Sequence, residues 1–140
     1  MDIFTSLYTA GSALTAQRLR MDVIASNLAN VDTTTTPQGG PYKREMVVFQ
    51  PRPNLVGGPI QAPTDGVEVT GIVQDTSPPR LVHDPGNPQA NANGFVAYPN
   101  IDYTTEMVDL MAANRAYEAN ASVIKTTKNV VQQTIDLGKA

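Results

Sequence analysis

The only histidine of the chain, His83, is followed directly by Asp84, so this pair is the first place to look for catalysis. A histidine and aspartate that activate a hydroxyl nucleophile need a serine within hydrogen-bond reach. Ser77 and Ser122 are the candidates, but neither lies in the G-x-S-x-G turn that exposes a nucleophilic serine. A small hydrolase built on His83 is therefore the weakest hypothesis, and a histidine beside a turn or in an interface is the better interpretation.

Two pairs of carboxylates, Asp65 with Glu68 and Glu106 with Asp109, are spaced so that each pair could share one face of a turn. Neither pair has a histidine or a third carboxylate nearby, so neither predicts a metal site. The chain contains no cysteine, which excludes thiolate ligands, cysteine nucleophiles and disulfides.

Glycine-rich phosphate-binding loops are also missing from the sequence. The pairs Gly39-Gly40 and Gly57-Gly58 lack the spacing that such a loop needs. We therefore expect no cofactor, no metal and no enzymatic activity.

The charge and hydropathy of the chain argue against two features, nucleic-acid binding and a membrane-spanning helix. The net charge is −3 and is spread evenly along the chain. Without a basic stripe to neutralise phosphates, we expect no nucleic-acid binding. No apolar run is long enough to span a membrane, and no positively charged segment opens a secretory signal peptide.

The distribution of proline divides the chain into three parts. All 11 prolines lie between Pro37 and Pro99. Because proline removes a backbone donor and clashes with the preceding helical turn, the proline-free ends are free to form long helices. We expect an N-terminal helix with its exit loop in residues 1–36, a module of short strands in residues 37–100 and a C-terminal helix in residues 101–140. The predicted fold class is mainly α, with the two helices forming a coiled-coil-like pair and a small β-hairpin module between them.

Both proline-free ends carry apolar residues at the heptad spacing of a coiled coil. In the first segment the stripe runs through residues 3–31, and Asp2 is a candidate N-cap. In the last segment it runs through residues 107–135, with Asp102 as a candidate N-cap and Gly138 as a candidate stop. We expect these stripes to form an assembly interface through Leu7, Leu14, Met21, Ile24, Leu28, Leu110, Tyr117, Ile124 and Val131.

An ordinary amphipathic helix facing its own core is the alternative interpretation of either stripe alone. Two matched stripes at opposite ends of a chain with little core between them favour a bundle or filament. Polar Gln17, Asn114 and Lys128 interrupt the stripes. Such residues either set the register of the helices or are partly exposed to solvent.

The middle segment predicts short strands separated by turns. Residues 42–49, 66–73, 80–82 and 94–98 are the strand candidates, and Gly71 suggests a bulge or bend in the second of them. We expect a small antiparallel hairpin module with long loops.

Several segments of the chain resemble the flagellar rod, hook and hook-associated proteins of bacteria. Residues 26–33 (SNLANVDT) resemble the N-terminal signature of this family, and residues 106–120 resemble its C-terminal signature. Residues 41–44, 83–88 and 94–100 are similar to the middle of the family's proximal rod proteins. The motif residues that carry the two end signatures are Asn27, Leu28, Asn30, Glu106, Met107, Arg115 and Tyr117.

The resemblance implies a structural subunit of the proximal rod of the flagellar basal body, which carries torque from the rotor to the hook. It implies helical assembly through the terminal helices with copies of itself, with other proximal rod proteins, with the distal rod and with a rotor-side adaptor. It also implies synthesis in the cytoplasm, export by the flagellar type III apparatus without a cleaved signal peptide, and a final place in the rod within the periplasm. A soluble adaptor or export chaperone with a helical hairpin, which would stay in the cytoplasm, is the alternative outside this class.

Overall fold

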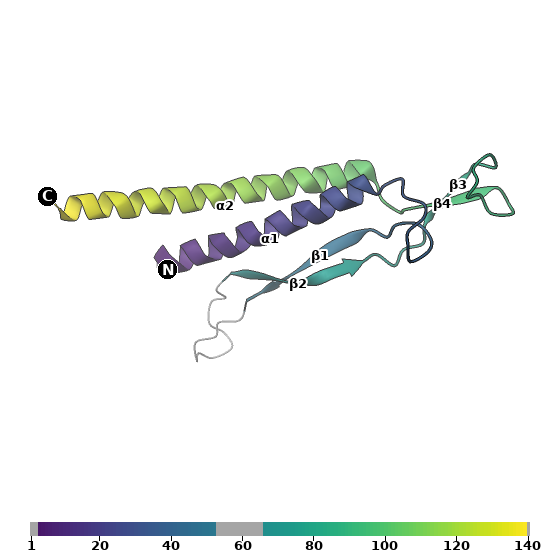
Figure 1. The fold of residues 1–140 in the computed structure, drawn as a ribbon. Coiled ribbons are helices and arrows are strands. Elements are labelled where there is room, and N and C mark those ends of the chain that lie inside the picture. The colour runs from purple at the N-terminus through teal and green to yellow at the C-terminus, as the bar shows by residue number, and fades with distance from the viewer. Residues whose placement is uncertain (1–2, 53–65, 140) are drawn as a thin grey trace.

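The structure is a computed structural model that describes residues 3–52 and 66–139. Within them the chain forms two long helices at its ends and four short strands between them (Figure 1). The predicted mainly α fold with a small β module is confirmed. Four residues considered above lie outside the described ranges, namely Asp2, Gly57, Gly58 and Asp65.

The elements follow the proline-free and proline-rich parts of the sequence. In chain order they are α1 (Ile3–Ala29), β1 (Glu45–Pro51), β2 (Val67–Gln74), β3 (Arg80–His83), β4 (Phe95–Tyr98) and α2 (Tyr103–Gly138).

The two helices lie side by side and run in opposite directions, so both chain ends lie at the same end of the molecule (Figure 1). With 27 residues α1 is about 40 Å long, and with 36 residues α2 is about 54 Å long. Every described residue of α2 beyond Val131 is exposed. The last turns of α2 therefore extend past the cover that α1 provides.

The structure tests the predicted ends of both helices. The predicted N-cap of α2 is confirmed, because the Asp102 carboxylate accepts a hydrogen bond from the Thr105 backbone N–H at 3.1 Å. Helix α2 ends at Gly138, as predicted, but this glycine has no positive φ, and Lys139 caps the helix in a right-handed conformation. The predicted apolar stripe of the first segment continues to Val31, whereas α1 already ends at Ala29.

The first hairpin pairs β1 with β2 in antiparallel register. Val48 lies opposite Gly71 and Phe49 lies opposite Val69, which leaves one extra residue, Thr70, on β2. This shift is the bulge that the glycine at position 71 suggested. The second hairpin pairs β3 with β4 without such a shift.

Helix α1 is the middle layer of the molecule (Figure 1). It packs against α2 on one side and against both β1 and β2 on the other. Its buried core residues are accordingly Ala10, Ala16, Val23 and Ile24, whereas Ala113 is the only buried apolar residue in the described part of α2. Among the described helices and strands only α1 contacts α2, so α2 is covered on one side only.

Candidate functional site

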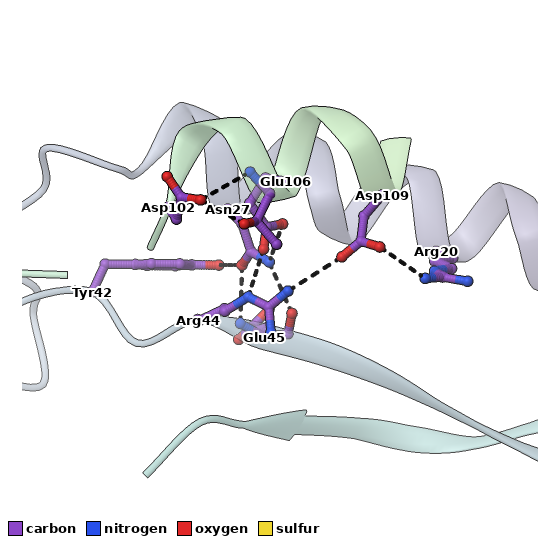
Figure 2. A network of polar contacts seen from close by, with 9 residues as sticks. Arg20, Asn27, Tyr42, Arg44, Glu45, Asp102, Glu106 and Asp109 are labelled. Atoms are coloured by element: carbon purple, nitrogen blue, oxygen red, sulfur yellow. Dashed lines mark hydrogen bonds and ion pairs between the residues drawn. The ribbon is translucent and has the colours of Figure 1, made fainter. Parts of the chain in front are cut away.

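The most connected group of polar side chains lies where the end of α1, the start of α2 and the start of β1 meet (Figure 2). Asn27 of α1 and Glu106 of α2 are its centre, and each is only 1% exposed. Buried polar groups are costly unless they are hydrogen-bonded, so the partners of these two side chains decide what the cluster does.

The Asn27 amide uses its full hydrogen-bonding capacity. Its Nδ2 donates to the Glu45 backbone carbonyl at 2.8 Å and to Glu106 Oε2 at 3.1 Å. Its Oδ1 accepts from the Glu45 backbone N–H at 2.9 Å and from the Tyr42 hydroxyl at 3.2 Å. Because it pairs with both backbone groups of Glu45, Asn27 binds the first residue of β1 much as a neighbouring strand would.

Glu106 and Arg44 form the charged part of the cluster. Arg44 Nε donates to Glu106 Oε1 at 2.5 Å, and Arg44 is the residue just before β1. The Glu106 carboxylate thus receives one hydrogen bond from α1 and one from the segment that enters β1. A buried carboxylate with a charged and a neutral donor is a satisfied group rather than a free acid.

Two further charged side chains, Arg20 and Asp109, extend this cluster towards the solvent (Figure 2). Arg44 Nη2 lies 3.6 Å from Asp109 Oδ2, and Arg20 Nη2 lies 3.4 Å from Asp109 Oδ1. Asp109 therefore bridges an arginine of α1 and the arginine that precedes β1. Because Arg20 and Asp109 are each about one-third exposed (36% and 35%), this outer pair contributes less than the buried one.

The start of α2 suits these acidic groups. The unpaired N–H groups of a helix start attract negative charge, and Asp102 and Glu106 occupy the cap and the first turn. Hydrogen bonds from the Thr105 hydroxyl and backbone N–H lower the pKa of Asp102 below its ordinary value of 3.8.

A second polar contact holds the other end of the first hairpin against α1. The Ser12 hydroxyl donates to the Thr9 carbonyl at 2.8 Å and accepts from the Val67 backbone N–H at 3.1 Å. Gly66, with φ +105°, precedes this strand, and a Cβ built on it would lie 2.3 Å from Ser12 Oγ. Only glycine fits this close approach and this backbone conformation.

The predicted assembly residues are all at least partly shielded from solvent within the single chain. Ile24 is buried, and the others, Leu7, Leu14, Met21, Leu28, Leu110, Tyr117, Ile124 and Val131, are partly buried. Packing of α1 against α2 and against β1 and β2 accounts for burial within one chain. A role in contacts between chains stays a prediction.

The polar residues that interrupt the stripes divide into two kinds. Asn114 and Lys128 are exposed, which agrees with the alternative that such residues are in contact with solvent. Gln17 is partly buried, and its Oε1 accepts no hydrogen bond within residues 3–52 and 66–139. None of the three forms a polar contact between the helices in the described part of the chain.

The structure brings together part of the two end motifs. Asn27 and Glu106 meet directly, and Asn30 closes α1 by donating from Nδ2 to the Ser26 carbonyl at 2.9 Å. Arg115 is exposed on α2. The remaining motif residues, Leu28, Met107 and Tyr117, are partly buried.

The residues considered for catalysis are engaged elsewhere. His83 packs edge-to-face on Phe95, with ring centroids 5.0 Å apart. The Ser77 hydroxyl donates to Asp75 at 2.6 Å, and Ser122 is exposed on α2. No hydrogen bond joins His83 to either serine in the part of the chain that the structure describes.

The candidate metal ligands have cationic partners instead. Glu106 and Asp109 both face Arg44, and Glu68 lies 3.7 Å from Arg52. Among the described residues no group of three or more histidine, cysteine or acidic side chains is arranged to hold a metal ion.

Several residues that make the contacts between elements were not assigned that role from the sequence: Arg20, Tyr42, Arg44, Ser12 and Gly66. Asp109 was considered as a candidate metal ligand instead. Arg44 was included only in a strand candidate and in the family resemblance, and no local pattern assigns it to a carboxylate 62 positions away. Gly66 offered one usable signal, since a glycine just before a strand often marks a close approach of another backbone or side chain.

Two protein-family models match this chain, one over each terminal helix. The family model described as flagella basal body rod protein matches residues 7–36, and the one described as flagellar basal body rod FlgEFG protein C-terminal matches residues 92–137. The first match covers most of α1, and the second covers β4 and nearly all of α2. The described part of the chain has no helix with the length and apolar character needed to cross a membrane.

Three curated relatives resemble the whole chain, and each is named flagellar basal-body rod protein FlgC. The one from Salmonella typhimurium is 48% identical over 130 residues, which are 93% of this chain and 93% of the relative. The one from Bacillus subtilis is 42% identical over 99% of this chain and 100% of the relative. The one from Borreliella burgdorferi is 42% identical over 96% and 97%.

The paired terminal helices and their matches define a structural protein of the flagellar rod class. The chain belongs to the FlgC family of flagellar basal-body rod proteins. The resemblance read from the sequence motifs is thereby confirmed.

Proposed function

We propose that this chain is a subunit of the proximal rod of the flagellar basal body, in which it assembles helically through its terminal helices. The observation that carries the proposal is the antiparallel pair of α1 and α2, which is built from the two segments that match the rod families. A helix pair with little core of its own is suited to burying its remaining apolar surface against neighbours.

The outer side of α2 offers that surface. Seven large apolar side chains of α2 are exposed by 45% or more, and the spacing of four of them places these four within about 60° of one another around the helix. The four are Val108, Val123, Val130 and Leu137. An exposed apolar stripe on a helix whose opposite side is already covered favours contact with another chain.

The proposed partners are copies of this chain, other proximal rod proteins, the neighbouring distal rod and a rotor-side adaptor. In this arrangement the helix pairs pack into the wall of a tube, and the first hairpin, attached to α1 at two points, stiffens each subunit. Such a tube would transmit torque from the rotor towards the hook.

The proposed route to the rod is the flagellar type III export apparatus, which would deliver the chain from the cytoplasm to the rod within the periplasm. Two properties support passage in an unfolded form. The chain has no cysteine, so no disulfide has to be broken or protected. Its core is small, so unfolding costs little buried apolar area.

Two charge substitutions on α2 test the assembly surface. Val123→Asp places a carboxylate in the outer stripe, whereas Asn114→Asp adds the same charge at an exposed position outside it. Both variants should keep the helix content of the wild type, measured by circular dichroism. In cells that lack the wild-type protein, we expect Val123→Asp to abolish motility and its own recovery in purified basal bodies, and Asn114→Asp to preserve both.

The same experiment separates the rod subunit from a cytoplasmic adaptor. A rod subunit fractionates with purified basal bodies, whereas an adaptor or export chaperone stays in the cytoplasmic fraction. Finding the wild-type chain only in the cytoplasm of cells with complete flagella would overturn the proposal.

A further inference from the structure

The apolar stripes of the two packed helices, α1 and α2, are periodic in sequence. Leu7, Leu14, Met21 and Leu28 repeat every seven residues on α1, and α2 repeats in the same way from Leu110 to Val131. A relative slip of seven residues, about 10 Å along the axis, would bring one repeat onto the next. The stripes by themselves therefore leave several registers with similar apolar contact.

The unequal lengths of the helices make such a slip easy. Helix α1 has 27 residues and α2 has 36, so α2 is longer by nine residues. Sliding α1 by one heptad towards the exposed end of α2 would keep much of its length covered. The polar residues within the stripes do not oppose the slip, because Asn114 and Lys128 are exposed and Gln17 has no hydrogen bond to α2 among the described residues.

The cluster of Asn27, Glu106 and Arg44 does not repeat. We propose that this buried cluster selects the register of the helix pair, and that the apolar stripes supply the contact without choosing its position. The cluster holds α2 through Glu106, α1 through Asn27 and the entry to β1 through Arg44. It thus fixes three elements at one point near the end of α1 (Figure 2).

A slip in either direction would break this arrangement. In one direction Ala113, seven residues after Glu106, would come opposite Asn27 and could accept no side-chain hydrogen bond. In the other direction Glu106 would move towards Arg20, seven residues before Asn27, but would leave Arg44 behind because Asn27 holds Glu45. Both shifts leave buried polar groups without partners, and that penalty is what would exclude them.

Distances between two spin labels measure the register directly. The chain has no cysteine, so Thr15→Cys on α1 and Thr134→Cys on α2 give two unique labelling sites, both exposed and far apart along the helix axis. In the otherwise wild-type chain, pulsed electron paramagnetic resonance should give one narrow distance. A slip of one heptad changes the axial separation of these two sites by about 10 Å, so it should add a second, resolved distance.

Two double variants that differ at one side chain test the role of Glu106. Glu106→Leu with Arg44→Met removes both charges and the hydrogen bond to Asn27, and we expect a helical chain with two label distances. Glu106→Gln with Arg44→Met also removes both charges but keeps an acceptor for Asn27 Nδ2, and we expect one distance. As a matched control, Arg52→Met with Glu68→Leu removes an ion pair outside the helix pair and should leave the wild-type distance unchanged.

Each contrary result overturns the proposal. A single wild-type distance in the leucine variant would mean that the stripes choose the register without the cluster. Loss of helix in that variant would mean that the cluster holds the fold itself. Two distances in the glutamine variant or in the control, or no defined distance in the wild-type chain, would remove the link between Glu106 and register.

Discussion

The two hairpins of this protein have the same antiparallel two-stranded design but different surroundings. Both β1 and β2 pack against α1, whereas among the described helices and strands β3 and β4 contact only each other. The first hairpin is attached near both of its ends, through Asn27 and through Ser12. The second hairpin lies at the end of the molecule that is farthest from the free ends of the two helices (Figure 1).

The second hairpin has contacts within its own loop and strands, and its loop also accepts a hydrogen bond at Gln89 Oε1 from the Thr34 hydroxyl. Asp84 and Gly94 are joined by a backbone hydrogen bond of 2.9 Å, and Asn91 Oδ1 accepts from the Phe95 N–H at 3.0 Å. A two-stranded sheet alone is at best marginally stable in water, so β1 and β2 depend on their cover by α1. The side chains of Asn27 and Ser12, together with the glycine at position 66, therefore attach the first hairpin to α1.

The largest effect should come from removing the buried carboxylate. Glu106→Leu leaves Arg44 Nε and one N–H of Asn27 without their acceptor, and breaking a buried ion pair on one side costs about 3–5 kcal/mol. We expect this loss in the free energy of unfolding measured by urea denaturation. Glu68→Leu is the control, because its pair with Arg52 is more than one-third exposed (39% and 37%) and should cost about 0–1 kcal/mol. Equal losses would mean that burial of the cluster has no special role.

The next effect compares two glycines, one in each hairpin. Both Gly66 and Gly94 have positive φ, +105° and +79°, and both have little room for a Cβ. Gly66→Ala should lower the free energy of unfolding of the helices by about 1–3 kcal/mol, because the strain and the clash with Ser12 act where β2 meets α1. Gly94→Ala should strain the loop of the second hairpin and change helix unfolding less. Thermal melting followed by circular dichroism measures both, and a larger effect of Gly94→Ala would contradict the comparison.

A smaller effect should follow from the hydroxyl that anchors β2. Ser12→Ala removes the acceptor of the Val67 N–H, and an intramolecular hydrogen bond contributes about 0.5–1.5 kcal/mol. Thr15→Ala is matched to it, since the Thr15 hydroxyl also donates to a carbonyl of α1, at 3.2 Å, but is exposed. Hydrogen exchange of the Val67 amide should rise in the serine variant and stay unchanged in the threonine variant.

The smallest effect is a pH dependence at the start of α2. The pKa of Asp102 in the folded chain lies below its ordinary value of 3.8, because Thr105 donates two hydrogen bonds to the carboxylate. The stabilisation that it contributes is therefore present above about pH 4 and is lost as the pH falls through the folded pKa. Asp102→Asn keeps a capping side chain that does not titrate. We expect the melting temperature of the wild type to fall relative to this variant below pH 4, and parallel curves would contradict the assignment.

The architecture of the helices was open to prediction because its signals are local. Prolines confined to residues 37–99 leave both ends free to form helices, and the heptads show which sides are apolar. The cap at Asp102 and the bulge beside Gly71 depend on residues close in sequence, and both were predicted. The family followed from motifs within the same segments.

Which of these residues meet depends on the packing of segments that are far apart in the sequence. Asn27 and Glu106 are 79 positions apart, and Arg44 and Glu106 are 62 positions apart. The sequence offered Gln17, Asn114 and Lys128 as polar residues able to set register, yet none of them joins the helices in the described structure. A seven-residue repeat looks the same after a shift of seven, so periodicity alone defines the face of a helix and leaves its position along the partner open. That position depends on the one buried polar contact that does not repeat.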